Sequence, residues 1–273
     1  MKLPAEWMVR DRYITGPDGE EVPSQILSDG RLAFIAREVP PFGAISYKLK
    51  KGAPKTIRKA VEVKGAQLSN EAITVVVDED SGTISSISYR GKELVDKENP
   101  YGFNEYWYTG LNAANPQKNS NPRIRIKENG PLLASLLVES DAPGAHGLQQ
   151  EIELAAGQEQ IRITNTVDKI KVLEDENVRF SFPFHIPESQ ARIDLAWAVM
   201  RPEQDQLKGA NKNFFCPQRW VDLSNDEIGV TWANLDAPLA EIGGMYGQNW
   251  MNDLKARPWM ETYRPSNLLF SWV

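Results

Sequence analysis

The sequence predicts an all-β protein whose antiparallel strands pack as a sandwich. In most of its apolar segments, apolar and polar residues alternate with a period of two, the pattern of strands with one buried face. Clusters of turn-forming residues separate these segments at intervals of about 8–12 residues, which is typical of sandwiches. No long helical pattern and no short repeat is visible. These three observations together predict the fold class.

The N-terminal block, from about Trp7 to Lys51, contains two candidate strands. They read RLAFIAREV and GAISYKLKK, and the turn clusters GPDGEEVPSQ and SDG precede the first. A basic, proline-containing stretch, KKGAPKTIRK at Lys50–Lys59, follows and is the best candidate for a domain boundary. We therefore predict a small β-domain over residues 1–55 and a large β-domain over residues 56–273.

The large domain opens with a predicted hairpin, AITVVVDEDSGTISSISYRGKELV, whose turn lies at Asp78–Gly82. Two more antiparallel pairs are expected in RIRIKENGPLLASLLVES and LQQEIELAAGQEQIRITNTVDK. Ile161 and Ile163 alternate with Arg162 and Thr164, so the last of these strands should have one solvated face. Further strands are predicted in RIDLAWAVM, RWVDLS, IGVTWAN and NLLFSWV.

The stretch NVRFSFPFHIP at Asn177–Pro187 predicts a strand that buries one side. That side carries Val178, Phe180, Phe182, Phe184 and Ile186. Arg179 and His185 fall on the other side, and we interpret His185 as a surface or strand-end residue. Pro183 cannot donate to a β-ladder, which predicts an edge strand or a bulge.

Composition excludes several classes of protein. The net charge is −6 and the basic residues do not cluster, so a nucleic-acid partner is not expected. No apolar run approaches the roughly 18 residues that span a bilayer, and the start, MKLPAEWMVRDRY, has no apolar signal segment. We expect no membrane partner. A cytoplasmic and a periplasmic location are not separated by these features.

Reactive residues are few. His146 and His185 have no nearby HxH, HxD or HExxH partner, so no metal site is expected at either. Cys216 lies between Phe215 and Pro217, where a small buried thiol is the common case. Neither a GxSxG motif nor a P-loop occurs, and the paired carboxylates fall in turns and connections. No catalytic residue is predicted in this chain.

Aromatic residues gather in two stretches, YGFNEYWYTGLN and GMYGQNWMNDLKARPWMETYRP. The first contains Tyr106 and Tyr108, and the second contains Trp250 and Trp259. Aromatic faces beside amides and charges suit carbohydrate, whose C–H faces stack while its hydroxyls bond to polar groups. The other interpretation is that these rings fill the core of a large sandwich.

Several segments resemble, in order, the large β-domain of zinc-dependent α-mannosidases, glycoside hydrolase family 38. They are NEAITVVVDEDSGTISSISYRGKELV, IRITNTVDK, VRFSFPF and QRWVDLSNDEIGVTWANLDAP. GEEVPSQ and VPPFGAISYKL resemble the small β-domain that precedes it in those enzymes. The resemblance implies a small β-sandwich followed by a large super-sandwich of the galactose-mutarotase-like type. It also implies that the small domain is incomplete and that the large one is cut at its C-terminal end.

The resemblance implies a catalytic portion outside this chain. In the family, an N-terminal β/α domain supplies the zinc ligands and the carboxylate nucleophile, which cleaves α-linked mannose with retention. We therefore expect no cofactor in this chain, with zinc in the missing catalytic domain, and no activity from the chain alone. Its expected partners are that domain of the same parent chain, which it would brace, and α-mannosides, whose cleft it would wall.

Tyr106 and Tyr108 are the first candidates for sugar contact, and Arg219 of QRWVDLS is the second. The alternatives are tyrosines of the core, and an ion pair of Arg219 with Asp222 or another carboxylate. Two other functions stay open. The chain could be an independent carbohydrate-binding module that uses Tyr106–Tyr108 or Trp250–Trp259, or an aldose-epimerase-like protein, which the mutarotase type of fold alone suggests.

Overall fold

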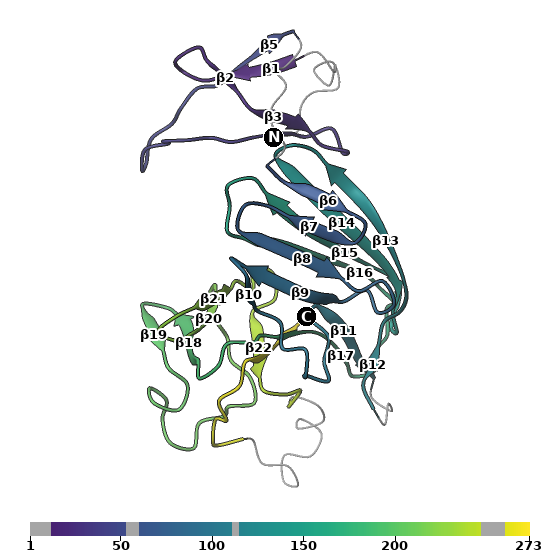
Figure 1. Ribbon diagram of the computed structural model, residues 1–273. Helices are drawn as coiled ribbons and strands as arrows, with labels where there is room; N and C mark the ends of the chain where they lie inside the picture. Colours follow the sequence, from purple (N-terminus) through teal and green to yellow (C-terminus); the bar gives the residue numbers. More distant parts are fainter. Residues whose placement is uncertain (1–11, 53–59, 111–114, 247–259) are drawn as a thin grey trace. The chain divides into compact units, whose positions relative to one another are not determined.

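The computed structural model describes residues 12–52, 60–110, 115–246 and 260–273. All regular structure in these ranges is β-strand, as predicted (Figure 1). No helix within them is long and apolar enough to cross a bilayer. The sheet registers pair antiparallel neighbours throughout, for example β11 with β17 and β17 with β23 (bounds below), which confirms the predicted fold class.

The first strands are β1 Arg12–Thr15, β2 Glu21–Val22, β3 Ser24–Ile26, β4 Leu32–Phe34, β5 Lys48–Lys51, β6 Glu62–Lys64, β7 Gln67–Ser69, β8 Ile73–Val77, β9 Ile84–Tyr89, β10 Lys92–Glu93, β11 Glu105–Gly110 and β12 Gln117–Lys118. The remaining strands are β13 Ser120–Asn129, β14 Leu133–Asp141, β15 Ala145–Ala155, β16 Ile161–Lys169, β17 Glu176–Pro183, β18 Gln190–Leu195, β19 Ala198–Met200, β20 Val221–Ser224, β21 Gly229–Trp232, β22 Leu239–Ile242 and β23 Leu268–Trp272.

The strands form two five-stranded sheets, with orders β10-β9-β8-β7-β6 and β12-β11-β17-β23-β22. Two four-stranded sheets have the orders β13-β14-β15-β16 and β19-β18-β20-β21. The N-terminal strands form the small sheets β2-β1-β5 and β3-β4.

The chain divides into two compact units. Unit 1 comprises Met1–Val76, Arg123–Glu139 and Gln149–Thr166, and unit 2 comprises Val77–Pro122, Ser140–Leu148 and Val167–Val273. The domain boundary predicted near residue 55 falls in residues 53–59, outside the described ranges, and stays a prediction.

In unit 1, side-chain hydrogen bonds attach the N-terminal block to the hairpin of β13 and β14; Ser28 donates to Glu128, and Gln25 makes several bonds. The Gln25 amide accepts hydrogen bonds from the backbone N–H groups of Leu132 and Leu133, at 3.1 and 2.9 Å, and donates to the Leu133 carbonyl. A Cβ at Gly130 would lie 1.9 Å from the Gln25 side-chain carbon. Glycine at this position therefore makes room for the amide.

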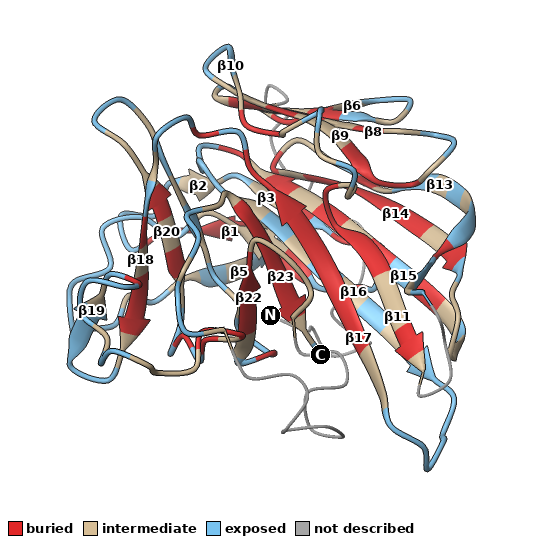
Figure 2. Ribbon diagram, turned by 90° about the horizontal axis from the view of Figure 1, so that it is seen from below, coloured by how far each residue is buried: buried red, intermediate tan, exposed pale blue. Residues whose placement is uncertain are grey.

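In unit 2, β17 is the central strand of its sheet, and Figure 2 shows it buried along most of its length. The predicted core side chains are buried: Val178, Phe180, Phe182, Phe184 and Ile186. Arg179 and Ser181 on the opposite side are buried as well, so this strand is covered on both faces. Of the two alternatives predicted from Pro183, an edge strand or a bulge, the edge strand is wrong, because β17 pairs with β11 on one side and β23 on the other. Pro183 is instead the last residue of β17.

The alternation found in the sequence correctly located β8 and β16, whose burial patterns alternate residue by residue. The segment RIDLAWAVM is not one strand. It folds back as the hairpin of β18 and β19, with Trp197 between them in the left-handed region at φ 65°.

Candidate functional site

Tyr106 lies on β11, directly opposite Phe180 of β17, and the two rings meet edge to face at 5.7 Å. Its side chain is 0% exposed, and its hydroxyl donates to the Pro143 carbonyl at 2.6 Å. Burial raises the pKa of Tyr106 far above its usual range, so the hydroxyl stays a proton donor. The structure therefore gives Tyr106 a packing role, while its contact with sugar stays a prediction.

Tyr108 points to the same side of β11 and belongs to a charged cluster. Its hydroxyl donates to Glu176 Oε2 at 2.8 Å, and Lys169 Nζ lies 2.6 Å from Glu176 Oε1. Burial raises the pKa of Tyr108, and so does the hydrogen bond to Glu176, because a carboxylate acceptor favours the protonated hydroxyl. The cluster joins the ends of β11, β16 and β17. Sugar contact by Tyr108 also stays a prediction.

Arg219 lies just before β20, and its side chain is 71% exposed. Its Nε donates to Asp194 Oδ2 at 3.1 Å, so the alternative of an ion pair with another carboxylate holds. Asp222, the carboxylate first considered for Arg219, pairs with Arg192 instead, at 3.4 Å. Among the described residues, no hydrogen bond or ion pair joins Arg219 to either predicted tyrosine.

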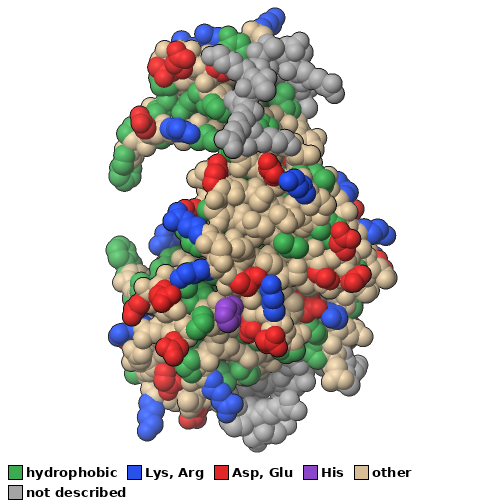
Figure 3. Space-filling view, in the orientation of Figure 1, with side chains coloured by type: hydrophobic (Ala, Val, Ile, Leu, Met, Phe, Trp, Pro, Cys, Tyr) green, Lys and Arg blue, Asp and Glu red, His purple; other side chains and the backbone are tan. Residues whose placement is uncertain are grey.

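His185 is exposed two residues after β17, which confirms its interpretation as a strand-end residue. It lines an open, polar pocket of about 770 Å³ with charged side chains such as Glu188 and Arg192. Figure 3 shows acidic and basic side chains interspersed over the face that it displays. Within the described ranges, no three His, Cys, Asp or Glu side chains are placed to hold a metal ion.

Cys216 is exposed, so the prediction of a buried thiol is wrong. Its neighbour Phe215 is the buried residue, only 5% exposed, and pairs through its backbone with Ala240. In extended chain, successive side chains point to opposite sides, which places the thiol outward when the phenylalanine points inward.

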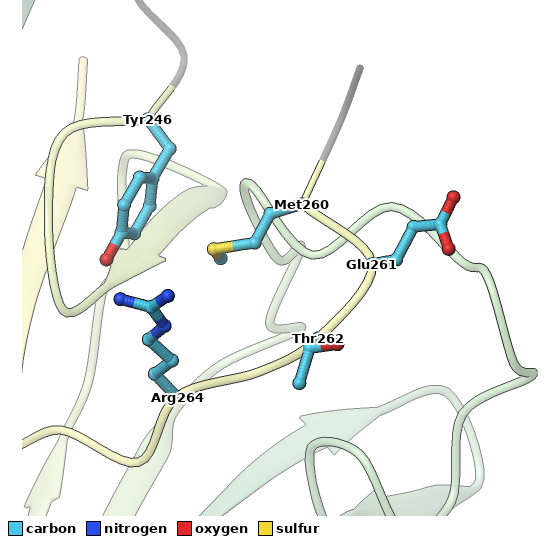
Figure 4. Close-up of a pocket in the computed structure, with 5 residues that line it drawn as sticks. All are labelled: Tyr246, Met260, Glu261, Thr262 and Arg264. Carbon is cyan, nitrogen blue, oxygen red and sulfur yellow. The ribbon is translucent and has the colours of Figure 1, made fainter. Parts of the chain in front are cut away.

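A second pocket, in unit 2, has a volume of about 390 Å³ and is lined by Tyr246, Met260, Glu261, Thr262 and Arg264. In Figure 4 the Tyr246 hydroxyl and the Arg264 guanidinium point toward one another, and the Met260 thioether points toward the tyrosine ring. The Glu261 carboxylate points away from them. Burial raises the pKa of Tyr246, although the nearby Arg264 opposes this shift.

Two buried side chains hold the backbone of this pocket. Asn213 donates to the Tyr246 carbonyl at 3.3 Å and accepts from the Met260 N–H at 2.7 Å. Lys212, 2% exposed, binds the Met260 carbonyl through its backbone N–H and the Glu261 carbonyl through Nζ. Asn213 thus links the two residues that flank the range 247–259, which lies outside the described residues and contains Trp250 and Trp259.

A buried ion pair supports the same pocket from the five-stranded sheet that contains β17. Glu241 on β22 accepts the backbone N–H of Tyr246 at 2.8 Å and bonds to the guanidinium of Arg179 on β17. Arg179 also lies 4.7 Å from the ring centroid of Trp272, on the strand between them. Both charged side chains are at most 1% exposed.

Sequence reasoning missed Arg264, Lys212, Asn213 and the Arg179–Glu241 pair. The available signal for Arg179 was a charged residue between apolar positions of a strand that proved to be covered on both faces. The pocket residues to which Lys212 and Asn213 bond are more than 30 positions away in the chain, so no local pattern could indicate these contacts.

The antiparallel sheets of the described residues define an all-β protein. The family model described as "Glycosyl hydrolases family 38 C-terminal domain" matches residues 68–237, more than half of the chain. The chain therefore belongs to this family, which confirms the resemblance found in the sequence.

Several solved structures are similar to the chain, including two from Enterococcus faecalis. The alpha-mannosidase from Enterococcus faecalis V583 gives a TM-score of 0.68 at 14% identity, covering 97% of this chain and 34% of that one. A protein in glycosyl hydrolase family 38, also from Enterococcus faecalis, gives 0.63 at 15% identity, covering 86% and 34%. At such identities the likeness shows the fold, and the chain spans about a third of the length of either structure. No curated protein matches the chain.

Proposed function

We propose that this chain is the C-terminal β-portion of a larger α-mannosidase, which hydrolyses α-linked mannose with retention. In it, the β-portion braces the catalytic domain and walls part of the sugar cleft. The observation that carries the proposal is the family match over residues 68–237, together with a fold that follows an α-mannosidase over 97% of this chain.

The packing of unit 2 supports the bracing role. Its five-stranded sheet buries β17 on both faces, and one ion pair joins β17 to β22 across β23. Such a sheet is a rigid support, because its side chains interdigitate at close to crystalline density. Residues that form the wall of a sugar cleft must keep their positions while substrate binds and product leaves.

Zinc belongs, in this proposal, to the catalytic domain rather than to this chain. The described residues offer no group of three or more potential ligands, so the zinc of the family does not fit them. We accordingly assign no chemical step to this chain. Its contributions are binding surface and positional stability.

The test compares the chain alone with the longer polypeptide obtained by extending its coding sequence upstream. We expect the longer polypeptide to hydrolyse an aryl α-mannoside and to lose this activity with a zinc chelator. The chain alone should show no hydrolysis. NMR of the first-formed sugar should show the α-anomer, because a retaining enzyme conserves the anomeric configuration. A longer polypeptide that hydrolyses no α-mannoside would overturn the proposal.

A further inference from the structure

Two hydrogen-bond donors in the pocket of unit 2 have no protein acceptor in the part of the chain that the structure describes. The Tyr246 hydroxyl and the Arg264 guanidinium face one another, yet neither makes a hydrogen bond or ion pair with a described residue. The raised pKa of Tyr246 keeps its hydroxyl protonated at neutral pH. Arg264 carries further N–H donors and a permanent positive charge.

Three buried polar side chains hold the backbone that lines part of the pocket. Lys212 is 2% exposed, and Asn213 and Glu241 are also buried. Burying such groups is unfavourable unless their hydrogen bonds are satisfied, and here those bonds go to the backbone of Tyr246, Met260 and, from Lys212, Glu261. The backbone is therefore held at Tyr246, and at Met260 and Glu261 a few residues before Arg264, without any ligand.

We propose that this pocket binds a small molecule through a carboxylate or phosphate group, with Arg264 and Tyr246 as donors and Met260 against the carbon skeleton. Two converging donors favour a group that only accepts hydrogen bonds, and a guanidinium pairs with such oxygens through two parallel bonds. A neutral sugar hydroxyl also donates a hydrogen bond and so needs an acceptor. The Glu261 carboxylate does not offer one beside the two donors, because it points away from them. The volume of about 390 Å³ lies within the usual range of ligand sites.

This inference does not depend on the proposed mannosidase, because it concerns binding by the chain itself. Titration calorimetry on the chain should use mannose 6-phosphate, glucuronate and mannose as probes. We expect at least one of the two anions to bind saturably, at least tenfold more tightly than mannose, and more weakly as salt rises. The two anions distinguish a phosphate from a carboxylate ligand. No binding of either anion, or equal binding of mannose, would overturn the inference.

Variants locate the site. Arg264→Gln should weaken binding of the anion at least tenfold, Arg264→Lys should weaken it less, and Tyr246→Phe should weaken it several-fold. Asn213→Ala should weaken binding with both donors still present, because it removes the hydrogen bonds that link Tyr246 to Met260. The matched control is Arg125→Gln on β13, which removes an exposed charge paired with Glu139 in unit 1. Thermal unfolding checks that each variant is folded. Unchanged affinity in folded Arg264→Gln would refute the site.

Discussion

At the scale of single residues, Gly144 allows the Tyr108 ring to pack where it does. Its φ is +72°, in the left-handed region, and an added Cβ would lie 2.4 Å from the ring. Gly147, three residues later on β15, has no heavy atom within 4 Å of an added Cβ. Replacing each glycine by alanine therefore separates the effect of left-handed strain and steric clash at residue 144 from the general effect of a glycine-to-alanine change.

Gly144→Ala should lower the free energy of unfolding by about 2–4 kcal/mol, because it adds left-handed strain to a steric clash. Gly147→Ala should change it by less than about 1 kcal/mol. Urea denaturation of both variants measures the difference. Equal effects would show that the Tyr108 ring does not depend on Gly144.

The pKa of the Glu93 carboxyl is strongly lowered. Burial alone would raise this pKa, but hydrogen bonds from Lys97, Ser86 and the backbone of Val95 and Ile87 lower it from 4.5 to about 2. The charged form is therefore stabilised in the folded state. Its stabilisation is complete above the unfolded pKa and is lost as pH falls from 4.5 toward 2.

Glu93→Gln should cost about 1–3 kcal/mol at pH 6, a range that allows for solvent screening. The cost should shrink as pH falls to 3, because the unfolded wild-type carboxyl then gains a proton and the folded one does not. Chemical denaturation at several pH values measures both proteins. Glu62→Gln, in an exposed pair with Lys64, serves as control and should show little effect. A cost for Glu93→Gln that is independent of pH would contradict this account.

At the scale of elements, the Arg179–Glu241 pair links three strands of the sheet that contains β17. Arg179 lies on β17 and Glu241 on β22, and Trp272 of the intervening β23 packs under the guanidinium. A buried charge that loses its partner is left without solvation, which makes single replacements costly.

Arg179→Met and Glu241→Met should each lower the free energy of unfolding by about 3–5 kcal/mol. The double variant should cost clearly less than the sum, because no unpaired charge remains. Arg192→Gln, which removes a partly exposed ion pair with Asp222, should cost less than about 1 kcal/mol. Urea denaturation of the four variants tests this coupling. Strict additivity of the two Met replacements would show that the pair is not coupled.

Strands whose burial alternates could be predicted from the period of two, and β23, which is buried without alternation, lay in a predicted apolar segment, whereas β11 was not predicted as a strand. The alternation of Ile73, Val75 and Val77 located β8. In β11, Glu105 and Tyr106 are adjacent and both buried, so the period of two is lost. The site was predicted less well, because Tyr106 and Tyr108 are bonded within the fold and the pocket at Arg264 depends on contacts across the chain.

At the scale of the whole molecule, family membership and fold agree. The matched range, 68–237, contributes strands to both units, and the fold follows a larger α-mannosidase over nearly the whole chain. The chain nevertheless spans about a third of that structure. A division of labour follows in our proposal: this portion supplies support and binding surface, and the catalytic domain supplies zinc and the nucleophile.

The rate of aryl α-mannoside hydrolysis, measured in zinc-containing buffer, tests this division most directly. The chain alone should release product no faster than buffer does, and the upstream-extended polypeptide should turn over substrate at an ordinary enzymatic rate, about 1 s⁻¹ or more. Saturable hydrolysis by the chain alone would contradict the account, because the reacting groups would then have to lie within these 273 residues.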